Sequence, residues 1–140
     1  MNKKLLSAVL SVGVFATALP AMAASAPSAA KISCVSNAVN TRESALVSAI
    51  STYTQSVNSA YSARAAALQQ AYSQTPGQSV IKKAVRSAWA TFSAAMKSAR
   101  SGWQSARKSA WATFGSAVKA CKAPTVATDA GNAGAEASGN

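Results

Sequence analysis

Residues 81–124 read IKKAVRSAWAT, FSAAMKSARSG, WQSARKSAWAT and FGSAVKACKAP, which are four consecutive units of eleven residues. Each unit begins with a large apolar residue and has alanine at its fourth position. Eleven residues make almost three helical turns, at about 3.67 residues per turn, so the first residues of successive units share one face of a helix. Alanine also has the highest intrinsic helix propensity. The repeat therefore predicts one long helix with a continuous apolar stripe.

The same spacing extends back over residues 35–78. These units read VSNAVNTRESA, LVSAISTYTQS, VNSAYSARAAA and LQQAYSQTPGQ, again with a large apolar first residue and alanine at position four. The register then slips by two residues at Thr75-Pro76-Gly77-Gln78-Ser79, where proline and glycine favour a turn. We expect helices over about 35–74 and 79–122, joined by a turn at 75–78.

Two cysteines test this arrangement. Cys34 lies 43 residues before Gly77 and Cys121 lies 44 residues after it, so a chain that folds back at the turn brings them level. An even number of cysteines in an exported protein usually indicates a bridge. The predicted fold is all-α: an antiparallel two-helix hairpin, coiled-coil-like with an eleven-residue repeat, closed by a disulfide. Free thiols, or pairing between chains, are the alternatives.

The position of the turn also predicts which residues face one another. In this register the numbers of two facing residues sum to about 156, so Leu46 lies opposite Ala110. Large residues then face small ones along the contact between the two helices, which lets the helices interlock. The same register sets Arg42 and Arg64 beside Phe114 and Phe92, within reach of cation–π contacts. The other large residues of the first helix expected to face alanines are Val39, Ile50, Val57, Tyr61, Leu68 and Tyr72.

The two ends of the chain differ from the repeat region. Residues 1–23 have the pattern of a secretory signal peptide, with Lys3 and Lys4, an apolar stretch and an Ala21-Met22-Ala23 cleavage site. We therefore expect bacterial export, to a periplasmic, cell-surface or secreted location. Residues 24–33 are expected to be a linker. Residues 123–140 have no large side chain except Val126, so we expect a disordered tail.

Composition excludes most enzyme classes. The chain has 14 Lys plus Arg, 3 Asp plus Glu and no His, for a net charge of +11. Removal of Lys3 and Lys4 with the leader leaves 12 basic and 3 acidic residues, a net charge of +9. Carboxylate dyads, Ser-His-Asp triads and His-based metal sites need residues that this chain lacks. We expect no catalysis, no metal and no other cofactor.

Positive charge gathers in the second helix. Residues 80–122 carry nine basic residues and no acid. Charge of one sign is the electrostatic footprint of polyanion binding, whereas a face that serves only solubility usually mixes signs. Expected partners are extracellular nucleic acid, an anionic cell-wall polymer or another acidic surface; a solvated face without a ligand is the alternative. The candidate polyanion-binding residues are Lys82, Arg86, Lys97, Arg100, Lys108, Lys119 and Lys122.

Trp89 and Trp111 lie beside the predicted apolar stripe. They could stack on exposed bases between the cations. Alternatively, they could join a flank of small residues that includes Thr91, Gly102 and Thr113 in an interface between hairpins, which would make a four-helix bundle or fibre. A structural, self-assembling protein of the cell envelope is therefore the rival function.

Two further alternatives remain open. A basic amphipathic helix can lie on an acidic membrane, although the disulfide would keep the apolar stripe inside the hairpin. Alanine-rich helices with threonines eleven residues apart, as at Thr41 and Thr52, resemble type I fish antifreeze proteins. That resemblance implies ice binding, but the lysines on the neighbouring flank are foreign to the pattern.

Overall fold

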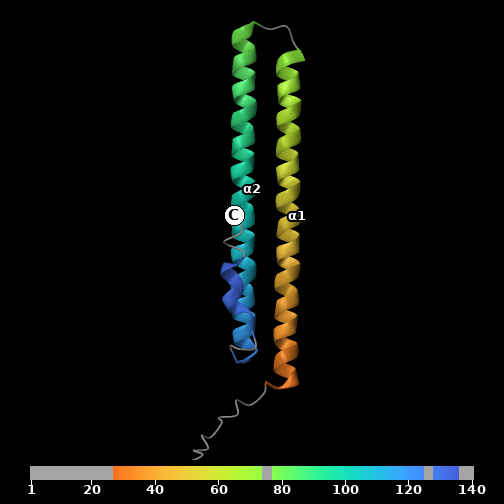
Figure 1. Cartoon of the computed structure of the whole chain (residues 1–140), viewed down its shortest axis with the longest axis vertical. Helices are drawn as coiled ribbons and strands as arrows, with labels where there is room; N and C mark the ends of the chain where they lie inside the picture. Colours follow the sequence, from red (N-terminus) through yellow and green to blue (C-terminus); the bar gives the residue numbers. More distant parts are fainter. Residues whose placement is uncertain (1–26, 74–76, 125–127, 136–140) are drawn as a thin grey trace, which may run out of the picture.

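The computed structural model describes residues 27–73, 77–124 and 128–135. Two long antiparallel helices lie side by side (Figure 1): α1 spans Ala29–Ser73 and α2 spans Gln78–Ala120. A short 3-10 helix, η2, follows at Ala130–Gly134. The described residues contain no strand, and the predicted all-α hairpin is confirmed. The predicted signal peptide at 1–23 and turn residues 75 and 76 lie outside the described residues.

Both helices begin earlier than expected, and α2 ends two residues before the expected position. α1 begins six residues earlier than expected, and the carbonyl of Ser28 accepts hydrogen bonds from the backbone N–H groups of Lys31 (2.9 Å) and Ile32 (3.1 Å). Ala29 and Ala30 continue the helix backward because alanine favours helical backbone. The described end of the predicted 24–33 linker is therefore mostly helical. α2 begins one residue earlier than expected, after Gly77.

The hairpin is closed at the end opposite the turn. Cys34, in the second turn of α1, forms a disulfide with Cys121, which caps the end of α2. Their Cα atoms lie 5.7 Å apart, although 87 positions separate them in the sequence. The predicted bridge is confirmed, and no cysteine of the described residues is free.

The core is a narrow seam between the helices. Phe114 is its most buried side chain, at 1% exposure, and packs with Ala38 and Val118. Leu46 and Ala110 are also both buried, as expected for a seam in which large residues face small ones. The described packing does not by itself define a coiled coil, so the eleven-residue coiled-coil repeat stays a prediction.

Some large residues lie outside this seam. Tyr61 is 47% exposed, but its ring packs edge to face on Phe92 of α2, with 5.0 Å between the ring centres. Ile50 and Tyr72 are exposed, so the expectation that they pack between the helices is wrong. They occupy the fifth position of their units, about 40° around the helix from the first position. A hairpin of two helices buries only a narrow strip of each helix, and these side chains fall beyond its edge.

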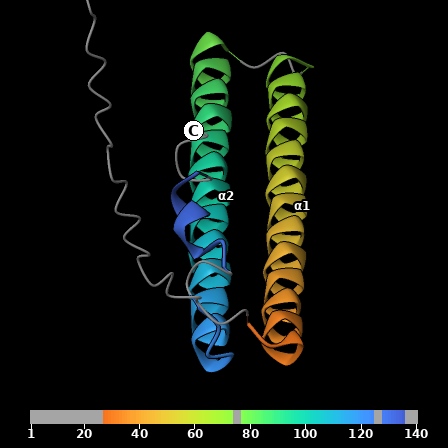
Figure 2. The same cartoon turned by 60° about the horizontal axis from the view of Figure 1, so that its bottom comes forward.

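The described part of the tail packs on the hairpin. Figure 2 shows η2 beside the half of α2 that lies nearer the disulfide, and Asp129, just before η2, forms an ion pair with Arg42 of α1. This differs from the expected disorder over residues 123–140. The expectation considered only the small apolar content of the tail. In the structure, the carboxylate of Asp129 binds the buried guanidinium of Arg42, and this ion pair holds the tail on the hairpin.

Candidate anion-binding face

The basic residues of α2 lie along one side of the helix. At 100° per residue, Lys82, Arg86, Lys97, Arg100, Lys108 and Lys119 fall within an arc of about 100°. All six are exposed, as is Lys122 just beyond the end of α2. From Lys82 to Lys119 the row is about 55 Å long at 1.5 Å per residue. We call these seven residues the cationic face.

Two more basic residues border this row and were not among the predicted ones. Lys83 is exposed and Arg107 is half-buried, and each lies about 60° around α2 from Arg86. The sequence-based candidates came mainly from the sixth and ninth positions of each unit; a plot of every basic residue around the helix would have included these two.

Neither carboxylate of the described residues pairs with the cationic face. Glu43 and Asp129 both bind Arg42, and no ion pair between described residues involves any of the seven cations. Within the described ranges, their charges are therefore not neutralised by a carboxylate.

Arg42 contacts two carboxylates and two aromatic rings. Its guanidinium lies 4.3 Å from the ring centre of Trp111 and 4.4 Å from that of Phe114. Nη1 donates to Oδ1 of Asp129 at 2.9 Å, and Nε donates to Oε1 of Glu43 at 2.9 Å. Only 5% of Arg42 is exposed. Stacking covers the faces of the guanidinium, and carboxylates take the donors at its edge.

This contact changes the proton affinity of both partners. The hydrogen bond from Arg42 holds the pKa of Asp129 below its ordinary value, and it outweighs desolvation, which acts in the opposite direction. The same hydrogen bond raises the pKa of Arg42. Both groups are therefore charged at neutral pH.

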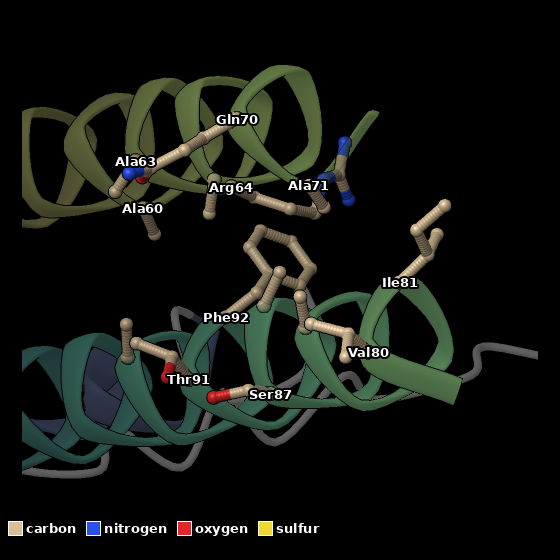
Figure 3. Close-up of a pocket in the computed structure, with 14 residues that line it drawn as sticks. Ala60, Ala63, Arg64, Gln70, Ala71, Val80, Ile81, Ser87, Thr91 and Phe92 are labelled. Atoms are coloured by element: carbon tan, nitrogen blue, oxygen red, sulfur yellow. The ribbon is translucent and has the colours of Figure 1, made fainter. Parts of the chain in front are cut away.

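Arg64 lies in a second aromatic site, nearer the turn. Its guanidinium is 4.3 Å from the ring centre of Phe92, 4.6 Å from that of Trp89 and 4.8 Å from that of Tyr61. Figure 3 shows Arg64 reaching from α1 across the ring of Phe92, which points up from α2. The predicted contacts of the two arginines with Phe114 and Phe92 are confirmed.

Each tryptophan on the flank also stacks on an arginine. Trp111 is half-buried, whereas 47% of Trp89 is exposed. Sequence analysis placed them beside the seam but missed their arginine partners. The available signal was their spacing, since each lies three residues before a phenylalanine and packs edge to face on it.

A groove of small residues runs along the opposite side of the hairpin. It consists of three hollows of about 370, 730 and 300 Å³; the first two share Ala95 and the last two share Ala45 and Ala106. Thr91, Gly102 and Thr113 line it, but Trp89 and Trp111 do not. The two tryptophans lie on the cationic side, so one flat interface between hairpins cannot include both them and the small-residue flank.

The chain matches no protein-family model, no curated protein and no solved structure. Its class is defined by its own geometry: a disulfide-closed helical hairpin with a cationic side and a side lined mainly by small residues. Within the described residues, no group of three or more His, Cys, Asp or Glu side chains could hold a metal ion. No helix in the described ranges is long and apolar enough to cross a bilayer.

Proposed function

We propose that this protein is an exported, non-enzymatic helical hairpin that binds anionic polymers or envelope surfaces through the cationic face. The observation that carries this proposal is the alignment of six exposed cations along one side of α2, with Lys122 just beyond its end; none of the seven is paired with a described carboxylate. Binding of a polyanion to such a row releases condensed counterions, which favours association.

The shape of the face favours a long ligand. A straight row of about 55 Å is much longer than a small anion and suits an extended polymer such as nucleic acid or an anionic cell-wall polymer. Trp89 stands beside the row with about half of its surface exposed (47%), and an indole in that position can stack on an unpaired base. Single-stranded nucleic acid therefore has one more favourable contact than a polymer without bases.

A retention experiment tests the proposal. The mature, oxidised protein is passed over immobilised DNA, cell wall and acidic vesicles at increasing salt. Replacing Arg86, Lys97, Lys108 and Lys119 with glutamine should weaken DNA binding and lower the slope of log K against log salt by about 3, because each phosphate contact contributes about 0.7–0.9. Lack of retention of the wild type at physiological salt would refute the proposal.

A matched variant separates charge from structure. Lys97→Arg, Lys108→Arg and Lys119→Arg change three of the side chains but keep their charge, so the triple variant should keep its retention. If it loses as much binding as the glutamine variant, the effect comes from a disturbed hairpin, and the cationic face is not the binding surface.

The groove supports a second candidate, a structural protein that assembles through its small-residue side. Small side chains allow helices to approach closely, and the groove extends over most of the hairpin. Assembly of this kind should persist at high salt, whereas polyanion binding should weaken steeply. Sedimentation at low and high salt distinguishes them, and Ala106→Glu, within the groove, should prevent assembly without weakening the cationic face. Membrane binding ranks lower, because the disulfide holds the apolar seam closed.

A further inference from the structure

The Arg42 and Arg64 sites are two copies of one arrangement. Arg64 follows Arg42 by 22 residues in α1, and Trp89 and Phe92 precede Trp111 and Phe114 by 22 residues in the antiparallel α2. The ring centres of Trp111 and Phe114 are 5.7 Å apart, with an interplanar angle of 86°. The ring centres of Trp89 and Phe92 are 5.9 Å apart, with an interplanar angle of 89°.

The surroundings of the two arginines repeat as well. Ten residues line the hollow beside Arg42, and each has a counterpart 22 positions away that lines the hollow beside Arg64. Figure 3 shows Ala60, Ser87 and Thr91 at the Arg64 hollow, and the corresponding residues at the other hollow are Ala38, Ser109 and Thr113. Two units of the eleven-residue repeat therefore separate two equivalent sites.

The two sites differ in what their guanidinium donors bind. At Arg42 the donors meet Glu43 and Asp129. At Arg64 the residue equivalent to Glu43 is Ala65, and no carboxylate of the described residues forms a hydrogen bond or ion pair with Arg64. Arg64 is half-buried rather than buried, so solvent still reaches it. Aromatic rings stack on its guanidinium, but they accept none of the hydrogen bonds that its edge can donate.

The described part of the tail lies beside the Arg42 site and does not extend to the Arg64 site. The described tail reaches the cationic side through Ala133, which lines a shallow site with Gln104, Arg107, Lys108 and Trp111. The positions 22 residues earlier are Lys82, Val85, Arg86 and Trp89, three of them exposed and Val85 half-buried. Figure 2 shows η2 beside the lower part of α2 only.

Asp129 of the same chain cannot bind Arg64. Phe92, which stacks on Arg64, precedes Cys121 by 29 residues, a distance of about 44 Å along α2. Eight residues connect Cys121 to Asp129 and span at most about 29 Å when fully extended. Neither Asp129 nor Glu43, the two acidic residues of the described ranges, therefore supplies a carboxylate to Arg64.

We propose that Arg64, together with Lys82, Arg86 and Trp89, binds the carboxylate of an acidic peptide segment of a partner protein. The contact at Arg42 shows the chemistry of the ligand: an aspartate flanked by small residues, as in Thr128-Asp129-Ala130-Gly131. A guanidinium already held between rings loses little freedom when it binds, and its fork matches the two oxygens of a carboxylate. The proposal goes beyond the binding of polymers, because it depends on the geometry of one arginine and not on the field of the whole face.

A peptide titration tests this site. The probe is an acetylated and amidated peptide with the sequence of residues 128–135, added to the isotope-labelled, oxidised mature protein while the indole N–H signals are followed by NMR. We expect the Trp89 signal to shift saturably and the Trp103 and Trp111 signals to stay constant. The same peptide with asparagine in place of aspartate should bind at least about tenfold more weakly. Absence of a saturable shift, or equal binding of both peptides, would overturn the proposal.

Matched variants locate the contact and separate it from the polymer-binding function. Arg64→Lys keeps the charge but loses the planar fork, so peptide binding should fall at least about tenfold while DNA retention stays unchanged. Lys31→Arg, a charge-conserving change at an exposed position of α1 outside the cationic face, should change neither. Equal peptide affinity in Arg64→Lys would refute the site, and because the two peptides are compared on the wild type, a poorly folded variant does not remove the test.

Self-association is the remaining outcome. If the protein dimerises with rising concentration and Arg64→Gln abolishes the dimer, a second copy fills the site and the assignment to a partner protein is wrong. A protein that stays monomeric while it binds the peptide supports the assignment.

Discussion

The Oδ1 and Oδ2 atoms of Asp129 lie 2.9 Å and 2.8 Å from the two terminal nitrogens of Arg42, 87 residues earlier in the chain. This two-pronged contact joins the C-terminal tail to α1 and lies beside Trp111 of α2. One ion pair therefore connects the tail with both helices.

Replacing Asp129 with asparagine should release the tail. Asp129→Asn keeps the shape but removes the charge, and because the carboxylate is partly exposed we expect a loss of only about 1 kcal/mol in the free energy of unfolding. Faster amide exchange over residues 128–135 is the specific readout. Asn132→Ser, at an exposed position of η2, is the control, and equal exchange in both variants would argue against the ion pair as the anchor.

Acid should detach the tail in a defined pH range. Because Arg42 lowers the pKa of Asp129, the stabilisation is fully present above the ordinary value of 3.8 and is lost as the pH falls through the lower native pKa. Amide exchange of the tail should therefore be constant from neutral pH down to about 4, after correction for its intrinsic pH dependence, and rise below that. Asp129→Asn should show no such step. Release well above pH 4 would contradict the assignment.

The two aromatic arginine sites should differ in stability. Arg42→Ala removes the stacking and leaves two carboxylates without their partner, so we expect a loss of about 2–3 kcal/mol. Arg64→Ala removes stacking alone and should cost about 1–2 kcal/mol. Urea denaturation measures both, with Arg100→Ala as an exposed control. Equal losses at the two sites would mean that the carboxylates contribute nothing.

Loss of the disulfide should weaken the end of the hairpin opposite the turn. Cys34→Ser combined with Cys121→Ser removes a constraint on a loop of 86 intervening residues, which stabilises by at most about 4–5 kcal/mol. Urea denaturation of the oxidised wild type, the reduced wild type and the double variant gives the difference. We expect the reduced wild type and the variant to agree, and a stability equal to that of the oxidised protein would contradict the prediction.

Glycine at position 122 should stabilise the helix end. Lys122 follows the cap of α2 with φ of 50°, in the left-handed region that favours glycine. Lys122→Gly should raise the free energy of unfolding by up to about 1 kcal/mol while DNA retention falls slightly, because one cation is lost. Lys119→Gly, one turn earlier within the helix, should instead destabilise by a similar amount. A lower melting temperature for Lys122→Gly would contradict this prediction.

The sequence alone predicted the long-range pairings that depend on periodicity. A constant eleven-residue spacing keeps one stripe on each helix, and a turn halfway between Cys34 and Cys121 aligns the two stripes. The disulfide and the contacts of Arg42 and Arg64 with Phe114 and Phe92 follow from these two features, because a straight helix converts sequence distance into position along an axis.

Other features depended on the tertiary structure. Ile50 and Tyr72 fit the periodic pattern but lie outside the seam, because the width of a buried strip depends on how many helices pack around it. The tail has no periodicity, and its place on the hairpin depends on a carboxylate that meets a guanidinium 87 residues away. Spacing describes the order within a helix, whereas burial and ion pairing require the positions of both partners in space.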